Sequence, residues 1–217
     1  MEFNPSYQTA IDGHIHLTEE DCVNNRELIE EIFYEHAMKS RLGMGELLEW
    51  LANCTDFYVA PCSTVYHLCT TGGLALHSLK VYEIFDKLCD IFHPSFPASS
   101  RAICALLHDT CKTNTYRTAI KSRKTGELWP NGKAKWEDYV GYEFDDKFPY
   151  GHGEKSVYLI MNHIGLTPEE AMAIRWHMGG YDDTAKSNPR PLGNACNLYR
   201  AVSLLHSADL IATSMGF

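Results

Sequence analysis

The chain has 217 residues, of which 45% are hydrophobic and 22% are charged, a composition typical of one soluble globular domain. No apolar run approaches the roughly 18–20 residues of a bilayer span, and the N-terminus lacks a signal-peptide pattern, so we expect a cytoplasmic protein with no membrane partner. The net charge of −9 argues against a surface built for long duplex nucleic acid. The eight cysteines form no C-x-x-C pair, which favours free thiols over a disulfide framework or a zinc–thiolate site.

The first half of the chain is predicted to be helical with one irregular segment. Apolar residues recur at helical spacing in three segments, residues 24–40, 44–54 and 74–92. A proline and paired glycines make residues 56–73 irregular. We expect Ser99 or Ser100 to cap the helix that follows.

The second half combines a predicted β insertion with further helices. Residues 114–146 contain the turn-like "KTGE" and "WPNGK" between short alternating stretches, which predicts one or two short antiparallel hairpins. Helical patterns resume in residues 153–165, 167–180 and 197–215. Thr167 with Glu170 predicts a capping box, and Pro168 suits the first helical position between them.

The stretch "CALLHDTCK", residues 104–112, places His108, Asp109 and Lys112 at the end of an apolar helix. A lone His-Asp pair in such a position is usually structural, so a functional interpretation requires further ligand-type side chains. Four are found on or beside other predicted helices: His77, His152, His177 and Asp209. Helical bundles build metal sites from side chains that converge in this way.

The order H…HD…H…H…D resembles the HD-domain superfamily of metal-dependent phosphohydrolases. The motifs that carry the resemblance are "GGLALHS", "LLHDTCK", "GHGEKS", "RWHMGG" and "SADL". The resemblance covers residues 57–213 and implies an all-α HD-domain helical bundle, with a short β-hairpin insertion after the HD helix. We expect a single domain over residues 1–217, in which residues 1–53 form an N-terminal helical cover.

The resemblance implies a two-metal site. His77, His108, Asp109 and Asp209 would hold one ion, and Asp109, His152 and His177 would hold the second, with Asp109 bridging. Imidazole and carboxylate ligands suit two divalent transition-metal ions, such as Fe, Mn, Ni, Co or Zn, and Mg is possible. Two ions can activate a water and clamp a phosphoryl oxygen.

Lys112 follows Asp109 by three residues, so both lie on one helical face. Its ammonium could contact a substrate phosphate, which would make Asp109 and Lys112 the catalytic pair, or it could form only a salt bridge to Asp109. Residues 112–135 contain seven basic residues and one acidic residue. This stretch indicates a phosphate-bearing substrate, with Arg117, Lys121 and His67 as further binding residues, or else a solvated hairpin.

The aromatic residues among these lysines and arginines also leave two interpretations open. Aromatic rings beside basic residues can stack on bases. We favour a hairpin that packs the rings into a small core of its own: Tyr116, Trp129, Trp136, Tyr139 and Tyr142.

The expected activity is metal-dependent hydrolysis of a phosphoester by a metal-activated water. Residues 56–78 with "LLHDTCK" resemble most closely the HD domain of bacterial 3'-to-5' exoribonucleases. This chain has no room for the OB-fold domain of those enzymes, which favours a nucleotide or a short oligonucleotide as substrate. Two alternatives are a di-iron oxygenase of the HD type and a non-catalytic nucleotide or metal sensor. The oligomeric state is left open.

The other histidines are weaker candidates. His14 and His16, in "DGHIH", alternate as in some metal-binding strands, but the downstream ligands fit the HD pattern better. His163 is expected to be a core histidine within a helix. His206 precedes Asp209 by three residues and either orients that carboxylate or is simply buried.

Overall fold

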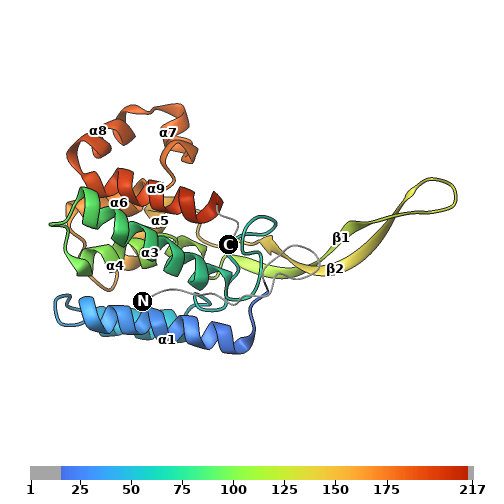
Figure 1. The fold of residues 1–217 in the computed structure, drawn as a ribbon, viewed down its shortest axis with the longest axis horizontal. Helices are drawn as coiled ribbons and strands as arrows, with labels where there is room; N and C mark the ends of the chain where they lie inside the picture. Colours follow the sequence, from blue (N-terminus) through green and yellow to red (C-terminus); the bar gives the residue numbers. More distant parts are fainter. Residues whose placement is uncertain (1–15, 215–217) are drawn as a thin grey trace.

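The computed structural model describes residues 16–214 as a helical body from which one two-stranded ribbon projects (Figure 1). The body begins with four helices, α1 (Glu19–His36), α2 (Met44–Asn53), α3 (Gly73–Phe92) and α4 (Ala98–Leu107), and the short 3-10 turn η1 (Thr110–Lys112). The ribbon follows as β1 (Tyr116–Leu128) and β2 (Ala134–Phe144). The remaining elements are α5 (His152–Met161), α6 (Pro168–Arg175), η2 (Gly179–Tyr181), α7 (Asp183–Ser187), α8 (Arg190–Leu198) and α9 (Arg200–Ser214).

Helix α3 lies at the centre of the body, where it packs on α1, α4 and α9. Its apolar side chains Leu74, Leu76 and Phe85 are fully buried, as are Leu106 on α4 and Leu205 on α9. Burial of such side chains is the main source of folding free energy. The same helices carry candidate ligands, His77 on α3 and Asp209 on α9, so the core fixes the positions of these side chains. The mostly helical fold with an antiparallel hairpin confirms the prediction at that level.

Two predicted helix starts had opposite outcomes. At α6, the Thr167 side chain accepts from the Glu170 amide and Glu170 caps the Thr167 amide in return, which confirms the capping box. At α4 the prediction was wrong, because the helix begins at Ala98 and its N-cap is Pro97. Ser100 is instead buried and accepts a hydrogen bond from Arg41.

The β insertion is one hairpin, and it is longer than expected. Its strands have 13 and 11 residues and pair antiparallel from Tyr116 opposite Phe144 to Lys124 opposite Trp136. The distal part extends well beyond the helices (Figure 1). The expectation that its rings pack a small core was wrong for both tryptophans, because Trp129 and Trp136 are 54% and 60% exposed.

The C-terminal region differs from the predicted single helix over residues 197–215. Tyr199 has an extended backbone, with φ −132° and ψ 112°, and it separates α8 from α9. His163 lies beyond the end of α5, where its ring contacts Trp50 at 4.8 Å, and not within a helix as expected. None of the described helices combines the length and apolarity of a membrane span.

Candidate metal centre

Asp109 lies at the centre of the histidine cluster, and its two carboxylate oxygens face different histidines. Oδ2 is 3.4 Å from Nε2 of His108 and 3.7 Å from Nε2 of His77. Oδ1 is 2.9 Å from Nε2 of His152 and 3.4 Å from Nε2 of His177. One carboxylate therefore separates the four imidazoles into two pairs.

Asp209 completes one of these pairs. Its Oδ1 lies 3.1 Å from Nε2 of His77, and His77, His108 and Asp209 present ligand atoms within 4.8 Å of one another. The ligand atoms of Asp109, His108 and His177 also lie within 4.8 Å of one another. The structure thus brings together all six residues that the sequence suggested as ligands.

The candidate ligands come from several parts of the body, and only His108 and Asp109 are neighbours in the sequence. His77 lies in the second turn of α3, His108 is the residue after α4, and Asp109 precedes η1. His152 begins α5, and Asp209 lies on α9. Because the ligands lie mainly at helix ends, their positions depend on how closely the helices approach one another.

Glycine permits two of these close approaches. A Cβ on Gly73, at the start of α3, would lie 2.1 Å from the Leu68 carbonyl oxygen. A Cβ on Gly153, beside His152, would lie 2.1 Å from the carbonyl oxygen of Arg175 at the end of α6. The second contact holds α5 against α6 and so holds His152 beside His177, whose ring centroids are 5.1 Å apart.

The tautomers of two histidines suit metal binding. Nδ1 of His108 lies 2.7 Å from the Ala105 carbonyl, and Nδ1 of His177 lies 2.7 Å from that of Ile174. A carbonyl only accepts, so each Nδ1 carries a proton, and Nε2 is the atom that presents a lone pair when the ring is neutral. Both Nε2 atoms are buried and have no hydrogen-bond partner within residues 16–214. A buried imidazole nitrogen of this kind, oriented by a backbone carbonyl, fits a metal ligand.

The ionisation states of the cluster point the same way. Burial lowers the pKa of His77 and His177 below the ordinary value, so both imidazoles are neutral near pH 7. Burial opposes ionisation of Asp109, but the neighbouring charges of Lys112 and His108 outweigh it and hold the Asp109 pKa well below its usual range. His77 and His177 are therefore neutral imidazoles beside an ionised carboxylate, the forms that bind divalent cations.

Burial opposes protonation of His108 and His152 as well. Asp109 outweighs burial at His108 and raises the pKa of that ring. Cys111 with Asp109 outweighs burial at His152 and raises the pKa of His152 to about 10. A metal ion would displace a proton from each of these two rings.

Lys112 makes the salt bridge that was one of its two predicted roles. Its Nζ lies 2.7 Å from Oδ2 of Asp109 and 3.4 Å from Sγ of Cys62. The Lys112 side chain is 16% exposed, and it lines cavities on two sides of the centre. The ammonium is therefore held beside the carboxylate and also reaches the space that a substrate would occupy.

Two cavities meet at Lys112 and His152, which line both of them. One, of about 320 Å³, is also lined by His67, Tyr181 and Asp209. The other, of about 270 Å³, lies at the base of the ribbon and includes Phe144. His67, predicted to bind substrate, thus lies in a suitable place, and burial lowers its pKa to about 4, so it is uncharged near pH 7.

Arg117 and Lys121, also predicted to bind substrate, lie on the ribbon and line neither of these cavities. Arg117 pairs with Glu143, and Lys121 donates to the Thr64 carbonyl at 3.4 Å. The basic stretch is thus partly neutralised by acidic residues of β2, through Arg123 with Glu137 at 2.7 Å as well as the Arg117 pair. The sequence interval 112–135 excluded these acids, because they follow the hairpin turn.

Two buried cysteines border the centre, and sequence reasoning did not assign them a role. Cys62 lies 3.4 Å from Nε2 of His67, and Cys111 lies 3.4 Å from Nδ1 of His152. Both cysteines belong to groups of residues that could hold a metal ion. The only sequence signal was the position of Cys111 two residues after Asp109.

The remaining histidines are separate from the ligand set. Nδ1 of His206 lies 2.7 Å from the His177 carbonyl oxygen. Because a carbonyl only accepts, Nδ1 of His206 carries the proton and donates this hydrogen bond. It therefore supports the backbone at His177, which differs from both of the predicted roles, orientation of the Asp209 carboxylate and simple burial. His16 lines a cavity beside the ribbon, and His14 lies outside the described residues.

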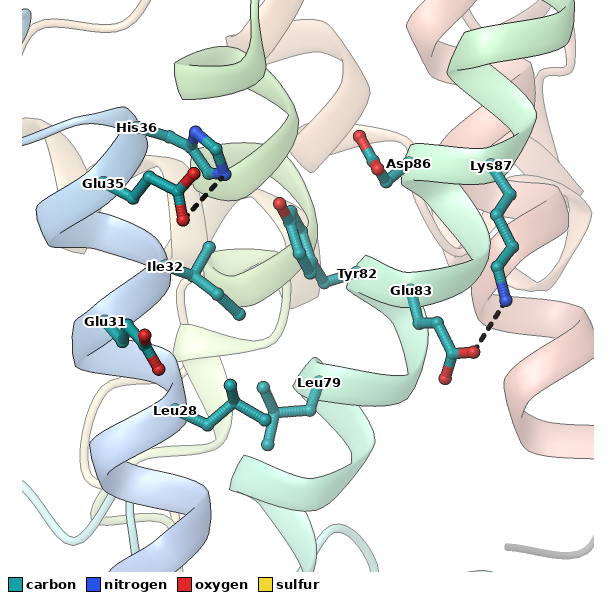
Figure 2. Close-up of a pocket in the computed structure, with 10 residues that line it drawn as sticks. All are labelled: Leu28, Glu31, Ile32, Glu35, His36, Leu79, Tyr82, Glu83, Asp86 and Lys87. Carbon is teal, nitrogen blue, oxygen red and sulfur yellow. Dashed lines mark hydrogen bonds and ion pairs between the residues drawn. The ribbon is translucent and has the colours of Figure 1, made fainter. Parts of the chain in front are cut away.

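A further cavity lies between α1 and α3, away from these ligands (Figure 2). It has a volume of about 340 Å³, and Tyr82 lies among its acidic residues, which include Glu31, Glu35, Glu83 and Asp86. None of the predicted ligands or substrate-binding residues lines it. Glu83 pairs with Lys87 at 2.7 Å, an exposed i, i+4 helix pair of small energetic value.

Comparisons with family models, curated proteins and solved structures find no match to this chain. The side chains around Asp109 are therefore the basis on which a function can be assigned.

Proposed function

We propose that this chain is a metal-dependent phosphohydrolase of the HD type, which cleaves a phosphoester of a nucleotide or short nucleic acid at a site for two divalent transition-metal ions. The observation that carries the proposal is the position of Asp109. Its two oxygens face separate pairs of histidines, and Lys112 lies 2.7 Å from one of them.

The ligand set fits two ions. His77, His108 and Asp209 would hold one with Oδ2 of Asp109, and His152 and His177 would hold the other with Oδ1. When bound, two such ions supply Lewis-acid polarisation and an activated water for displacement at phosphorus. The donor set of imidazoles and carboxylates suits Fe, Mn, Co, Ni or Zn.

The chain's own residues would do the remaining work. Lys112 would neutralise charge that develops on the phosphoryl oxygens, because its ammonium reaches the cavity. The Ala105 and Ile174 carbonyls keep His108 and His177 in one tautomer and one orientation. Asp109 would bind both ions, so its loss removes the part that the two half-sites share.

The size of the cavities supports a small substrate. Their volumes of about 320 and 270 Å³ are at the lower end of the range for small-molecule sites. A nucleotide or the end of a strand fits such a space, whereas the middle of a duplex does not.

The first experiment is metal analysis of the purified chain after reconstitution, followed by a hydrolysis screen against nucleotides, cyclic dinucleotides and short RNA and DNA. We expect two equivalents of transition metal and phosphoester cleavage in the wild type. Asp109→Ala should lose both properties, whereas Asp183→Ala should keep them, because Asp183 is an exposed carboxylate on α7. Iron with oxygen consumption and no hydrolysis would support the oxygenase, and unchanged hydrolysis in Asp109→Ala would show that the site is wrong.

A further inference from the structure

The ribbon carries an apolar stripe on one face. Side chains paired across an antiparallel ladder share a face, so the even-numbered residues of β1 and β2 lie together. Four of them are large, apolar and between 60% and 79% exposed: Ile120, Trp136, Val140 and Phe144. Ile120 lies directly opposite Val140, whereas Ser122 and Asp138 separate this pair from Trp136. Large exposed apolar side chains gathered on one face mark an interaction site.

The distal half of the ribbon is basic on an acidic molecule. Residues 121–139, which form the distal part of both paired strands, contain five basic residues and three acids, a formal charge of +2. The whole chain has −9, so the remainder has −11. A polyanion would therefore be attracted to the ribbon and repelled by most of the rest of the surface.

The basic residues are placed beside the exposed rings. Lys124 Nζ lies 5.7 Å from the centroid of the Trp136 ring, directly across the ladder, and Lys135 Nζ lies 5.1 Å from that of Trp129. Lys124 and Lys133 form no ion pair with any residue in the described range, whereas Arg123 and Lys135 pair with acids. One acidic residue, Asp138 on β2, lies on the same face as the stripe. It accepts a hydrogen bond at 2.7 Å from Ser122, which lies opposite it on β1.

The stripe leads to the candidate metal centre. Phe144, at the base of the ribbon, lines the cavity that also contains Lys112 and His152. The eight residue steps from Trp136 to Phe144 span about 26 Å of extended strand. A ligand lying along the stripe would thus run from Trp136 to the cavity beside the centre, along the ribbon that leaves the helical body in Figure 1.

We infer that this face of the ribbon binds a single strand of nucleic acid, with unpaired bases on Trp136 and Phe144 and phosphates near Lys124 and Lys133. Exposed rings with cations beside them, as Lys124 is beside Trp136, can stack the bases of a single strand and bind its backbone. Paired bases would not offer their ring faces, which excludes a duplex. The direction of the strand toward the centre rests on the proposed function, whereas binding itself does not.

The test is fluorescence anisotropy of labelled oligothymidylate and oligouridylate of about twelve nucleotides, with the full chain in EDTA so that no cleavage occurs. We expect binding that Trp136→Ala weakens about tenfold and Trp136→Phe largely retains. Lys124→Ala with Lys133→Ala should lower the salt dependence of binding by about one unit of log–log slope. Tyr34→Ala, an exposed ring on α1, and Lys87→Ala are the matched controls.

Hydrolysis of bis(p-nitrophenyl) phosphate, which is too small to reach Trp136 from the centre, separates the two proposals. Trp136→Ala should leave it unchanged, so loss of strand binding with intact hydrolysis supports the inference. Equal affinity in Trp136→Ala and wild type would overturn the inference even if the centre is active. A dimer in sedimentation that Val140→Ser converts to a monomer would also overturn it, because the stripe would then bind a second copy.

Discussion

Nζ of Lys112 lies 2.7 Å from Oδ2 of Asp109, the oxygen that also faces His77 and His108. The ammonium therefore binds the same carboxylate oxygen that would bind a metal ion. A metal ion on this side would meet the positive charge of Lys112 as well as its ligands. The positive charge of Lys112 therefore lowers the affinity for a metal ion but stabilises a bound phosphate.

The first prediction is that Lys112→Ala binds metal at least as tightly as the wild type but hydrolyses its substrate about a hundredfold more slowly. Removal of the ammonium relieves repulsion of the ion and also removes a charge that faces the phosphoryl group. Calorimetric titration with Mn²⁺ or Zn²⁺ and measurement of kcat/KM check the two effects. Lys186→Ala, on exposed α7, should change neither. Loss of metal in Lys112→Ala would mean that the lysine only holds the site together.

The second prediction concerns the two halves of the centre. His177→Ala should lose the ion on the Oδ1 side of Asp109, and His77→Ala should lose the ion on the Oδ2 side, since each histidine faces one oxygen. Elemental analysis should give about one equivalent for each variant. His163→Ala, whose ring lies against Trp50, should retain two. Two equivalents in both ligand variants would contradict the partition.

Metal binding should also stabilise the fold, and the size of the effect is predictable. At a free metal concentration about a hundred times the Kd, one site contributes about 2.7 kcal/mol to the free energy of unfolding. In a chain of this length that raises the Tm by about 5–10 °C. Differential scanning calorimetry with and without metal should show the increase in the wild type and its reversal by EDTA. An unchanged Tm would argue against binding by the folded cluster.

Gly153 provides a test of the helix contact behind His152. In Gly153→Ala the new methyl group would meet the Arg175 carbonyl and push α5 from α6, so His152 and His177 would separate. We expect metal affinity on the Oδ1 side to fall about tenfold or more, as with other losses of ligand support. Gly165→Ala is the matched control, because its Cβ would have no neighbour within 4 Å. Equal metal affinity in the two variants would show that the close approach is not required.

The six residues around Asp109 could be selected from the sequence because their order resembles that of HD-domain proteins, and the structure brings them together. Their role as metal ligands stays a prediction. Local signals also succeeded where they are short-range, as with Thr167 and Glu170. The break at Tyr199 could not be predicted, because no proline or glycine stands at the position where the backbone becomes extended. Ser100 failed as a cap for a similar reason, since its hydroxyl is bound by the distant Arg41.

The hairpin shows a different limit. A charge count along the chain found the lysines and arginines of β1 but not their partners on β2, such as Glu143 opposite Arg117. Cross-strand pairing brings together residues that are far apart in sequence, and only the register reveals it. The exposure of Trp129 and Trp136 could not be predicted either, because it depends on how far the ribbon extends beyond the helices.

The last prediction concerns acid stability near α7. Burial opposes ionisation of Asp182, but hydrogen bonds from Arg175 and from the Ala185 amide outweigh it and hold the pKa of Asp182 below its ordinary value. A lowered pKa means that Asp182 stabilises the fold above about pH 4 and that this contribution is lost as the pH falls through the folded value.

Asp182→Asn should therefore be less stable than the wild type by about 1–2 kcal/mol near neutral pH, since it loses a hydrogen bond between charged groups at 2.9 Å. The asparagine still caps α7 at Ala185, so the change isolates the charge. Urea denaturation between about pH 6 and pH 3 should show the difference shrinking toward zero as the wild-type carboxylate becomes protonated. Asp183→Asn, whose side chain is almost fully exposed, should show no such convergence. A gap that stays constant with pH would assign the loss to packing, because only the ionised carboxylate can give a difference that disappears in acid.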